Sequence, residues 1–285
     1  MVIYNPTAGR RRRRKLDAVV DALTRRGAQV SLRATTCRGD AERLAGEASS
    51  IEFDRLVVAG GDGTINEAIN GLRDRAPPVA IVPLGTANVL AAELDLPPHA
   101  AALADAIMEG ALRAVAVGRV NGRAFTMMAG VGFDAYVVSH VSLRLKRAVG
   151  KLAYVIETLT QLLRYRRLMY DVTIDGKAYR ASSVIIANGR FYGGRFVCAP
   201  KARLDSSEFQ ACLFGRAGRW HVIRYALALL LGRLPRLKDV TVVPARMVEI
   251  AAPVGDPVQG DGDILGALPA RIEVAPERLR LVARR

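Results

Sequence analysis

The stretch Gly60-Gly61-Asp62-Gly63-Thr64 decides how the first part of this chain folds. It follows the apolar run 56–59, Leu-Val-Val-Ala, whose length and composition predict a buried parallel strand. It precedes residues 65–70, which have helical character, and Thr64 and Glu67 have the spacing of a capping box. A glycine-rich turn between a strand and a helix N-terminus presents free amides and the helix dipole to phosphate. The stretch predicts a phosphate site, the simpler alternative being a turn that only connects two elements.

Asp62 is unusual in such a turn, because a bare carboxylate repels a polyphosphate. Its presence is explained if a divalent cation, held directly or through water, lies between the carboxylate and a nucleotide.

Two further turns have the same layout. Residues 83–88, Pro-Leu-Gly-Thr-Ala-Asn, follow the apolar run 79–82, and Thr86 is suited to cap a helix over 87–94. Residues 4–9, Tyr-Asn-Pro-Thr-Ala-Gly, follow the stub of a first strand. Such strand–loop–helix turns predict an open parallel sheet, which binds ligands at the carboxyl ends of its strands. The Walker A and Rossmann glycine patterns are both absent.

In this order the three turns resemble the signature of the diacylglycerol kinase catalytic domain, which soluble bacterial lipid kinases share with the sphingosine kinases. The resemblance continues through Gly130–Ala135, Asn188-Gly189, Tyr192–Gly194, Ala199-Pro200 and Gly260–Asp263, and so covers nearly the whole chain. The stretch 60–64 alone would also suit an NAD kinase, and a close variant occurs in phosphofructokinases. The turn at 83–86 and the late Asp-Gly-Asp favour the lipid kinase.

The pattern of elements predicts two domains. Residues 1–116 alternate strands and helices, with helices expected at 13–26, 40–49, 65–73, 87–94 and 98–109. Closely spaced strands then predict an antiparallel sandwich over 117–275, at 115–120, 124–129, 170–174, 181–188, 209–214, 240–243, 247–251 and 271–274. The resemblance implies the same two domains. The first is an N-terminal Rossmann-like α/β nucleotide domain of the NAD kinase and phosphofructokinase type, and the C-terminal strand at 276–285 returns to it. The second is a C-terminal β-sandwich, and the active site is expected in the cleft between them.

The resemblance also implies an ATP- and Mg²⁺-dependent reaction. A lipid hydroxyl has a high pKa and needs a proton acceptor, and we predict Asp261 as this general base, the alternative being a plain Asp-Gly hairpin turn. Asp62 organises Mg²⁺, through water. The expected nucleotide site contains Asn5, Thr7, Gly60, Gly61, Asp62, Gly63, Thr64, Glu67, Thr86 and Asn88, with Asp263 and Arg12 as possible support.

Arg12 belongs to the basic run 10–15, which directly follows the first loop. Cations at a helix N-terminus oppose the dipole by roughly 0.3–1 kcal/mol each, which indicates an anionic ligand nearby. The alternative is a solvated first helical turn.

The chain departs from the family pattern at three places. Asp263 stands where relatives commonly have Glu, residues 205–207 read Asp-Ser-Ser where many have Asp-Asp-Gly, and Ala116 replaces an acidic residue. In some bacterial members the last two places hold a second, structural metal. We predict that this metal site is absent here.

The composition indicates an anionic partner. Among 285 residues, 42 are Lys or Arg and 27 are Asp or Glu, a net charge of +15, although an Arg-rich bias without a role is the alternative. Nucleic acid is not favoured, because aromatic residues make up only 6% and do not alternate with basic ones. The three cysteines and three histidines have no metal-ligand spacing, so buried free thiols are expected.

No signal peptide or transmembrane segment is evident, so a cytoplasmic protein, peripheral at the inner membrane face, is expected. The helical segments 148–167 and 220–234 each have an apolar face and basic ends. They either lie on an anionic membrane surface or cover the sandwich. The sequence leaves the oligomeric state open, and a dimer is compatible with it.

Together these observations predict a lipid kinase that phosphorylates diacylglycerol or a similar long-chain lipid alcohol. An NAD or other small-molecule kinase on the same fold, or a non-catalytic lipid-binding regulator, is the alternative.

Overall fold

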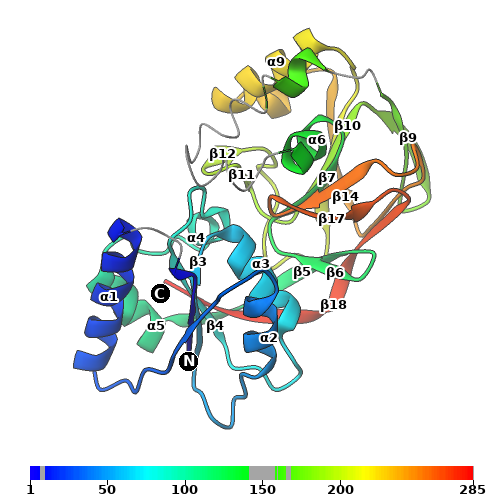
Figure 1. The fold of residues 1–285 in the computed structure, drawn as a ribbon. Coiled ribbons are helices and arrows are strands. Elements are labelled where there is room, and N and C mark those ends of the chain that lie inside the picture. The colour runs from blue at the N-terminus through cyan, green and yellow to red at the C-terminus, as the bar shows by residue number, and fades with distance from the viewer. Residues whose placement is uncertain (7–9, 141–157, 159, 165–167, 285) are drawn as a thin grey trace. The chain divides into compact units, whose positions relative to one another are not determined.

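The computed structural model describes residues 1–6, 10–140, 158, 160–164 and 168–284, and the chain divides into two compact units. Unit 1 contains Met1–Val115 and Glu277–Arg285, and unit 2 contains Ala116–Pro276 (Figure 1). The long strands β5 (Ala111–Val120) and β18 (Ala270–Ala283) carry the chain from one unit into the other.

Unit 1 is built on a parallel sheet with the strand order β2-β1-β3-β4-β18. Its strands are β1 (Val2–Tyr4), β2 (Leu32–Ala34), β3 (Leu56–Gly60), β4 (Val79–Pro83) and the last part of β18. The chain order reverses at β1, which pairs with β2 on one side and β3 on the other. Ligands of such sheets bind outside the carboxyl ends of the strands at this reversal.

Helices cover both faces of this sheet. They are α1 (Arg10–Arg25), α2 (Asp40–Gly46), α3 (Asp62–Gly71), α4 (Val89–Glu93) and α5 (Ala100–Glu109). Helices α1 and α5 lie on one face and α2 and α3 on the other (Figure 1). Because side chains alternate along a strand, Val57 and Ala59 face the α1 and α5 core, which also contains Leu16 and Leu103.

Two predicted helix caps are wrong. Helix α3 begins at Asp62 rather than at residue 65, and Gly61 at its N-cap forms no side-chain cap hydrogen bond, so Thr64 and Glu67 do not form a capping box. Helix α4 begins at Val89, after Asn88 at the N-cap, and Thr86 does not cap it.

Unit 2 is an antiparallel β-sandwich. One sheet has the order β14-β13-β10-β7-β16-β17, and strands of the other follow the order β18-β15-β8-β9. Its remaining strands are β6 (Arg123–Phe125), β7 (Met128–Val131), β8 (Tyr170–Ile174), β9 (Lys177–Ala181), β10 (Ser183–Ala187), β11 (Phe191–Tyr192), β12 (Phe196–Val197), β13 (Phe209–Phe214), β14 (Val240–Ala245), β15 (Met247–Ile250), β16 (Pro257–Gly260) and β17 (Asp263–Ala267).

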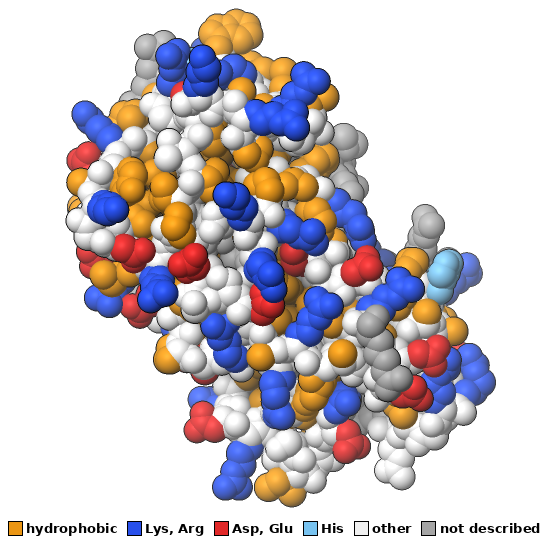
Figure 2. Space-filling view, turned by 180° about the vertical axis from the view of Figure 1, so that it is seen from behind, with side chains coloured by type: hydrophobic (Ala, Val, Ile, Leu, Met, Phe, Trp, Pro, Cys, Tyr) orange, Lys and Arg blue, Asp and Glu red, His pale blue; other side chains and the backbone are white. Residues whose placement is uncertain are grey.

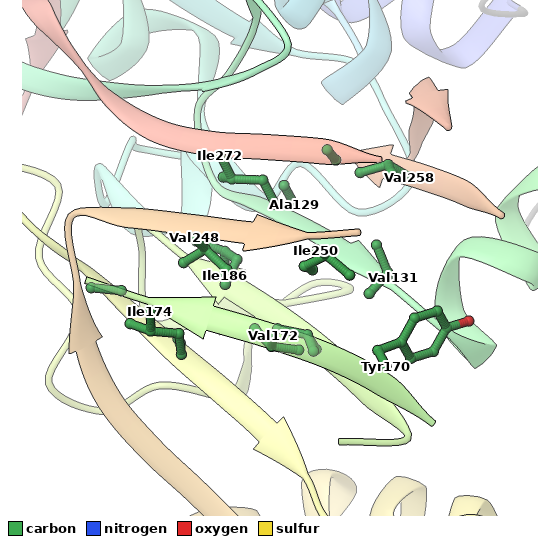
Figure 3. Close-up of a cluster of buried hydrophobic side chains, with 14 of the residues drawn as sticks. Ala129, Val131, Tyr170, Val172, Ile174, Ile186, Val248, Ile250, Val258 and Ile272 are labelled. Carbon is green, nitrogen blue, oxygen red and sulfur yellow. The ribbon is translucent and has the colours of Figure 1, made fainter. Parts of the chain in front are cut away.

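The core of unit 2 lies between these sheets. Val131 and Ile186 from one sheet meet Val172 and Ile250 from the other, and each is almost fully buried (Figure 3). Burying one such side chain contributes about 1.5–3 kcal/mol relative to leaving it exposed.

The helices of unit 2 only partly match the prediction. They include α6 (Phe133–His140), α9 (Arg219–Leu230) and a short 3₁₀ turn (Leu234–Arg236). The predicted helix at 148–167 falls mostly outside the described residues. No helix among the described residues is long and apolar enough to cross a membrane. All three cysteines are free, but Cys37 is exposed rather than buried.

The predicted strand at 124–129 is wrong, because it is two strands, β6 and β7, separated by Thr126 and Met127. Because of this break, the backbone amides of Thr126 and Met127 do not pair with a neighbouring strand. These amides bind a carboxylate of the candidate site.

Candidate active site

The two glycine turns of unit 1 pack backbone against backbone. A Cβ atom on Gly85 would lie 2.5 Å from the Cα of Gly61, and one on Gly61 would lie 3.1 Å from the Cα of Gly85. The backbone N–H of Leu84 donates to the carbonyl of Gly60 at 2.9 Å. The approach requires glycine at position 85 and leaves only a tight space for a Cβ atom at position 61.

Asp62 joins the two turns. Its Oδ2 accepts the backbone N–H of Asn88 at 2.9 Å, and its Oδ1 accepts that of Val89 at 2.7 Å. Asn88, at a φ of 50°, accepts the N–H of Gly85 at 2.7 Å and donates its amide to the carbonyl of Gly85 at 3.0 Å. The structure therefore brings together the predicted residues of both turns: Gly60, Gly61, Asp62, Gly63, Thr64, Thr86 and Asn88.

The surroundings of Asp62 suit an outer ligand of Mg²⁺. Two backbone amides hold its carboxylate in place, and the side chain is partly exposed. No three His, Cys, Asp or Glu side chains among the described residues cluster so as to hold a metal ion. Mg²⁺ commonly keeps several waters and binds one or two carboxylates with substrate phosphates, which fits this arrangement.

Two cations of helix α1 reach the second turn. An Nη of Arg12 donates to the Thr86 hydroxyl at 3.3 Å, and the Nζ of Lys15 donates to the Pro83 carbonyl at 3.2 Å. Partial burial lowers the pKa of Lys15. The sequence analysis did not single out Lys15, although its position three residues after Arg12 places both on one helix face.

The first loop is only partly described. The backbone N–H of Asn5 donates to the Ala59 carbonyl at 3.3 Å, which places Asn5 beside the end of β3. Thr7 lies outside the described residues.

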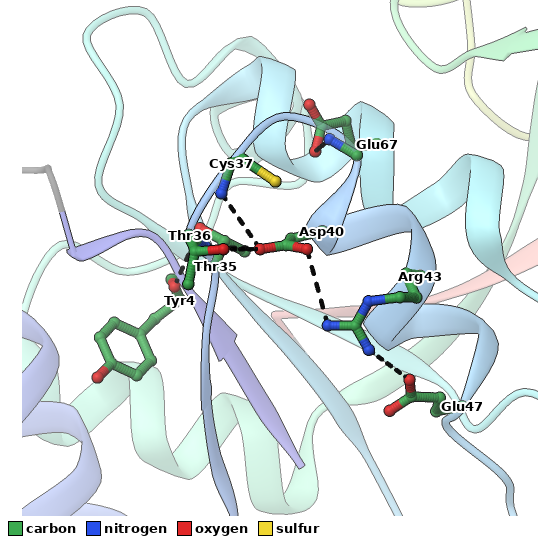
Figure 4. Close-up of polar contacts among 9 residues, drawn as sticks. Tyr4, Thr35, Thr36, Cys37, Asp40, Arg43, Glu47 and Glu67 are labelled. Carbon is green, nitrogen blue, oxygen red and sulfur yellow. Dashed lines mark hydrogen bonds and ion pairs between the residues drawn. The ribbon is translucent and has the colours of Figure 1, made fainter.

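The loop after β2 is a part of this edge that the sequence analysis missed (Figure 4). The backbone N–H of Thr35 donates to the Tyr4 carbonyl at 2.9 Å, and that of Gly39 donates to Glu67 at 3.1 Å. Asp40 accepts the Thr36 hydroxyl at 2.6 Å and the Thr36 amide at 2.7 Å, and these bonds lower the pKa of its carboxyl. Glu67 therefore orders a neighbouring loop. A Thr-Thr pair directly after a strand was the available signal.

In unit 2, Asp261 and Gly262 form the turn of the β16–β17 hairpin. Their φ values of 51° and 84° are both positive, as a type I′ turn requires. The Asp261 carboxylate accepts four hydrogen bonds. Its Oδ2 accepts the amide and hydroxyl of Thr126 at 2.7 and 2.9 Å, and its Oδ1 accepts the amides of Met127 and Met128 at 2.9 and 3.0 Å.

These contacts bear on the prediction that Asp261 is the general base. Four donors match about all the lone-pair sites of a carboxylate, so these hydrogen bonds hold the hairpin against the segment 126–128. Asp263 lies opposite Gly260 at the start of β17 and is partly exposed. The hairpin thus carries one carboxylate that holds the loop in place and a second two residues away. The base assignment stays a prediction.

A buried network lies behind this hairpin. The Tyr192 hydroxyl and the Nε2 of Gln259 donate to Asp134, the latter at 2.8 Å, and the Oε1 of Gln259 accepts the N–H of Gly262 at 3.1 Å. Burial raises the pKa of the Asp134 carboxyl, and the two donors oppose this rise. The network connects helix α6 to the β16–β17 hairpin.

Comparison with known proteins identifies the family. A family model of the diacylglycerol kinase catalytic domain matches residues 1–120, and a model of the YegS C-terminal NAD kinase beta sandwich-like domain matches residues 127–283. The chain belongs to the diacylglycerol kinase family. It is 32% identical to a diacylglycerol kinase of Bacillus subtilis (strain 168) and 30% identical to one of Staphylococcus carnosus (strain TM300), in each case over 94% of this chain and 90% of the relative.

A crystal structure of a diacylglycerol kinase from Bacillus anthracis str. Sterne matches with a TM-score of 0.79 at 25% identity, covering 99% of this chain and 96% of that one. The enzyme is therefore a lipid kinase with a Rossmann-like nucleotide domain and a β-sandwich. As a kinase it uses a nucleoside triphosphate as phosphoryl donor, and phosphoryl transfer usually needs a divalent metal.

The sequence analysis predicted that a second, structural metal is absent at two places, Ala116 and residues 205–207. The Ala116 N–H donates to the Leu204 carbonyl at 2.6 Å, and the Asp205 carboxylate is paired with Arg203 at 2.9 Å. The absence of that metal stays a prediction.

A cavity of about 220 Å³ in unit 2 has a mixed lining. Phe133, Tyr136 and Leu168 lie beside His140 and Arg164. It is smaller than the roughly 300–1,000 Å³ of a typical ligand pocket, so it does not by itself hold a long-chain lipid.

We expect the stability of Asp134→Asn relative to the wild-type lipid kinase to increase as the pH rises. The folded-state pKa of Asp134 is raised, so between the ordinary value of 3.8 and the raised value the folded state holds a proton that the unfolded state has lost. Wild-type stability therefore falls with rising pH across this window, whereas the amide has no such loss. Urea unfolding of both proteins over a pH series measures the difference. A difference that shrinks as pH rises would contradict the prediction.

Proposed function

We propose that the enzyme transfers the γ-phosphoryl group of ATP, with Mg²⁺, to the hydroxyl of diacylglycerol or a similar long-chain lipid alcohol. The use of a nucleotide is supported by the hydrogen bonds through which Asp62 holds the two glycine turns together at the carboxyl ends of β3 and β4. The choice of a lipid alcohol as substrate rests on the relatives, which are named diacylglycerol kinase.

The residues of unit 1 divide the phosphate chemistry between them. The amides of Gly61 and Gly63 at the start of α3, a ten-residue helix, bind phosphate oxygens with the help of the helix dipole. Arg12 and Lys15 supply positive charge beside the second turn. Asp62 would hold Mg²⁺ through water, and the metal would supply positive charge to balance the charge that develops on the phosphates.

The hairpin of unit 2 supplies the proton acceptor. A lipid hydroxyl is a weak nucleophile, so a carboxylate must take its proton as phosphorus–oxygen bond formation proceeds. The donors around Asp261 fix the hairpin, and Asp263, two residues further along, is a second carboxylate that is partly exposed. Positioning is the role proposed for Asp261 and proton acceptance the role proposed for Asp263, with Asp261 as the base, as predicted from the sequence, as the alternative.

The enzyme acts at the cytoplasmic face of an anionic membrane as a peripheral protein. Its net charge of +15 supports this, because a juxtamembrane basic residue contributes about 1 kcal/mol of attraction to anionic lipid.

The test is phosphoryl transfer from labelled ATP to a panel of lipid alcohols in anionic mixed micelles with Mg²⁺. The panel contains diacylglycerol, monoacylglycerol, a sphingoid base and a polyprenol, and NAD is assayed in parallel. We expect transfer to one lipid class and none to NAD. Asp62→Asn, purified in the same way, is the control for contaminating kinases. Transfer to NAD alone would identify a small-molecule kinase, and lipid binding without transfer would identify a regulator.

A further inference from the structure

Helix α9 exposes an unusually apolar surface. Trp220 is 81% exposed, Leu227 54%, Leu230 56% and Leu231, just after the helix, 67%. On an ideal helix with about 100° per residue, Trp220, Leu227, Leu230 and Leu231 fall within an arc of about 100°. Single exposed apolar residues are common, but a contiguous stripe of this kind marks a contact surface.

The opposite face of α9 is fixed to unit 2. Tyr225 and Ala228 are buried, and the ring of Tyr225 packs edge-on against Phe214 with centroids 5.0 Å apart. The Tyr225 hydroxyl donates to Asp239 at 2.7 Å, and burial together with this bond raises the pKa of Tyr225 to about 12. Because these contacts hold the helix, it cannot turn its leucines inward without losing them.

The stripe is bordered by positive charge. Residues 215–238 contain six Lys or Arg residues and no Asp or Glu: Arg216, Arg219, Arg224, Arg233, Arg236 and Lys238. Arg219 and Arg224 lie on opposite borders of the stripe on the ideal helix, and Arg224 is paired with Asp239. Arg219 also donates to the carbonyl of Leu163, a 71% exposed residue, which extends the apolar surface beyond α9. Figure 2 shows hydrophobic side chains among Lys and Arg at this end of unit 2.

We propose that this α9 face, defined by Trp220, Leu227, Leu230 and Leu231, docks on an anionic lipid bilayer. The bilayer is favoured over a protein partner because the apolar stripe matches its acyl-chain layer and the bordering arginines match its phosphate layer. An apolar stripe enters the boundary of headgroups and acyl chains, while flanking arginines with long apolar stems keep their charges at the phosphates. Tryptophan prefers this interface, where its ring is half in the apolar layer. The inference rests on the proposed function and deepens it, since it names the surface that brings the enzyme to its lipid.

Trp220 makes the docking directly measurable, because it is the only tryptophan of the chain. Its emission in buffer reports an indole in water. With phosphatidylglycerol vesicles we expect a blue shift and quenching by lipids brominated on their acyl chains, and a weaker response with phosphatidylcholine vesicles. Emission that stays unshifted with phosphatidylglycerol would overturn the proposal. A blue shift that depends on protein concentration without lipid would also overturn it, because the face would then be an interface between copies of the chain.

Variants separate the apolar from the charged contribution. Leu227→Ser with Leu230→Ser should weaken binding to anionic vesicles at least about tenfold, since two exposed leucines that would enter the bilayer are lost. Val254→Ser, at a 79% exposed position elsewhere on unit 2, is the matched control and should bind like wild type. Arg233→Gln with Lys238→Gln should weaken binding most at low salt, whereas Lys177→Gln with Arg180→Gln on β9 should not. Equal effects of the α9 and control variants would overturn the assignment of the surface.

The assay also distinguishes the docking surface from the kinase reaction. The Leu227 and Leu230 double variant should phosphorylate a water-soluble, short-chain diacylglycerol at the wild-type rate and lose activity only on vesicle lipid. If wild type phosphorylates no lipid alcohol but its emission still shifts, docking stands and the proposed function fails. If the short-chain substrate is phosphorylated and the emission never shifts, the function stands and the docking fails.

Discussion

Gly85→Ala is expected to abolish nucleotide binding by the kinase and to lower its free energy of unfolding by about 1–3 kcal/mol. The added Cβ would lie 2.5 Å from the Cα of Gly61 and 2.7 Å from the Oδ1 of Asn88, and the first contact is with backbone, which cannot rotate away. The two turns would have to separate. Separation lengthens the two hydrogen bonds that Asp62 accepts from the second turn.

The substitution should also lower the rate of phosphoryl transfer. A shift of about 1 Å in a phosphate cradle can cost roughly a hundredfold in rate, because phosphoryl transfer depends on positioning. Calorimetric titration with ATP and Mg²⁺ measures the nucleotide binding, urea unfolding measures the stability, and transfer from labelled ATP measures the rate.

Gly266→Ala is the matched control, because a Cβ there meets no atom within 4 Å and the φ is not left-handed. It should leave both quantities close to wild type. Wild-type ATP affinity in Gly85→Ala would show that the contact between the two turns is not needed for the phosphate site.

The sequence was sufficient for the two-domain fold because its signals there are local. Apolar runs such as Leu56–Ala59 stand directly before glycine turns, and the alternation of elements distinguishes a parallel sheet from a sandwich. The residues predicted for the nucleotide site of unit 1 come from the same turns, and the structure gathers Gly61, Asp62 and Asn88 at one sheet edge, while their role stays a prediction.

The features that were missed depend on long-range contacts. The apolar pattern runs unbroken through Thr126, and what ends the strand there is Asp261, 135 residues later. The cap of α4 was assigned to Thr86, the nearest suitable side chain, whereas Asp62 provides it from 26 residues earlier. A spacing rule such as the capping box considers only neighbours, and so it could not anticipate that Glu67 binds the loop at Gly39.

Asp261→Asn and Asp263→Asn should separate the two carboxylates of the hairpin. Asparagine tolerates the left-handed φ of 51° at position 261, so the substitution changes chemistry rather than backbone. The NH₂ group of the new side chain would face the N–H and O–H groups whose hydrogen bonds Asp261 accepts. These donors belong to Thr126, Met127 and Met128, which are each nearly fully buried. At least one buried amide would lose its partner. We expect Asp261→Asn to lower the free energy of unfolding by about 2–4 kcal/mol, with activity falling as the hairpin loosens.

Asp263→Asn should behave in the opposite way. Because the side chain is partly exposed at the start of β17, the free energy of unfolding should change by less than about 1 kcal/mol. Loss of the proton acceptor should lower kcat by roughly 10²–10⁴-fold without weakening ATP binding. Asp263→Glu, which restores a carboxylate, should recover activity. A stable, inactive Asp261→Asn beside an active Asp263→Asn would reverse the two assignments, because a carboxylate that only holds the hairpin cannot be removed without a loss of stability.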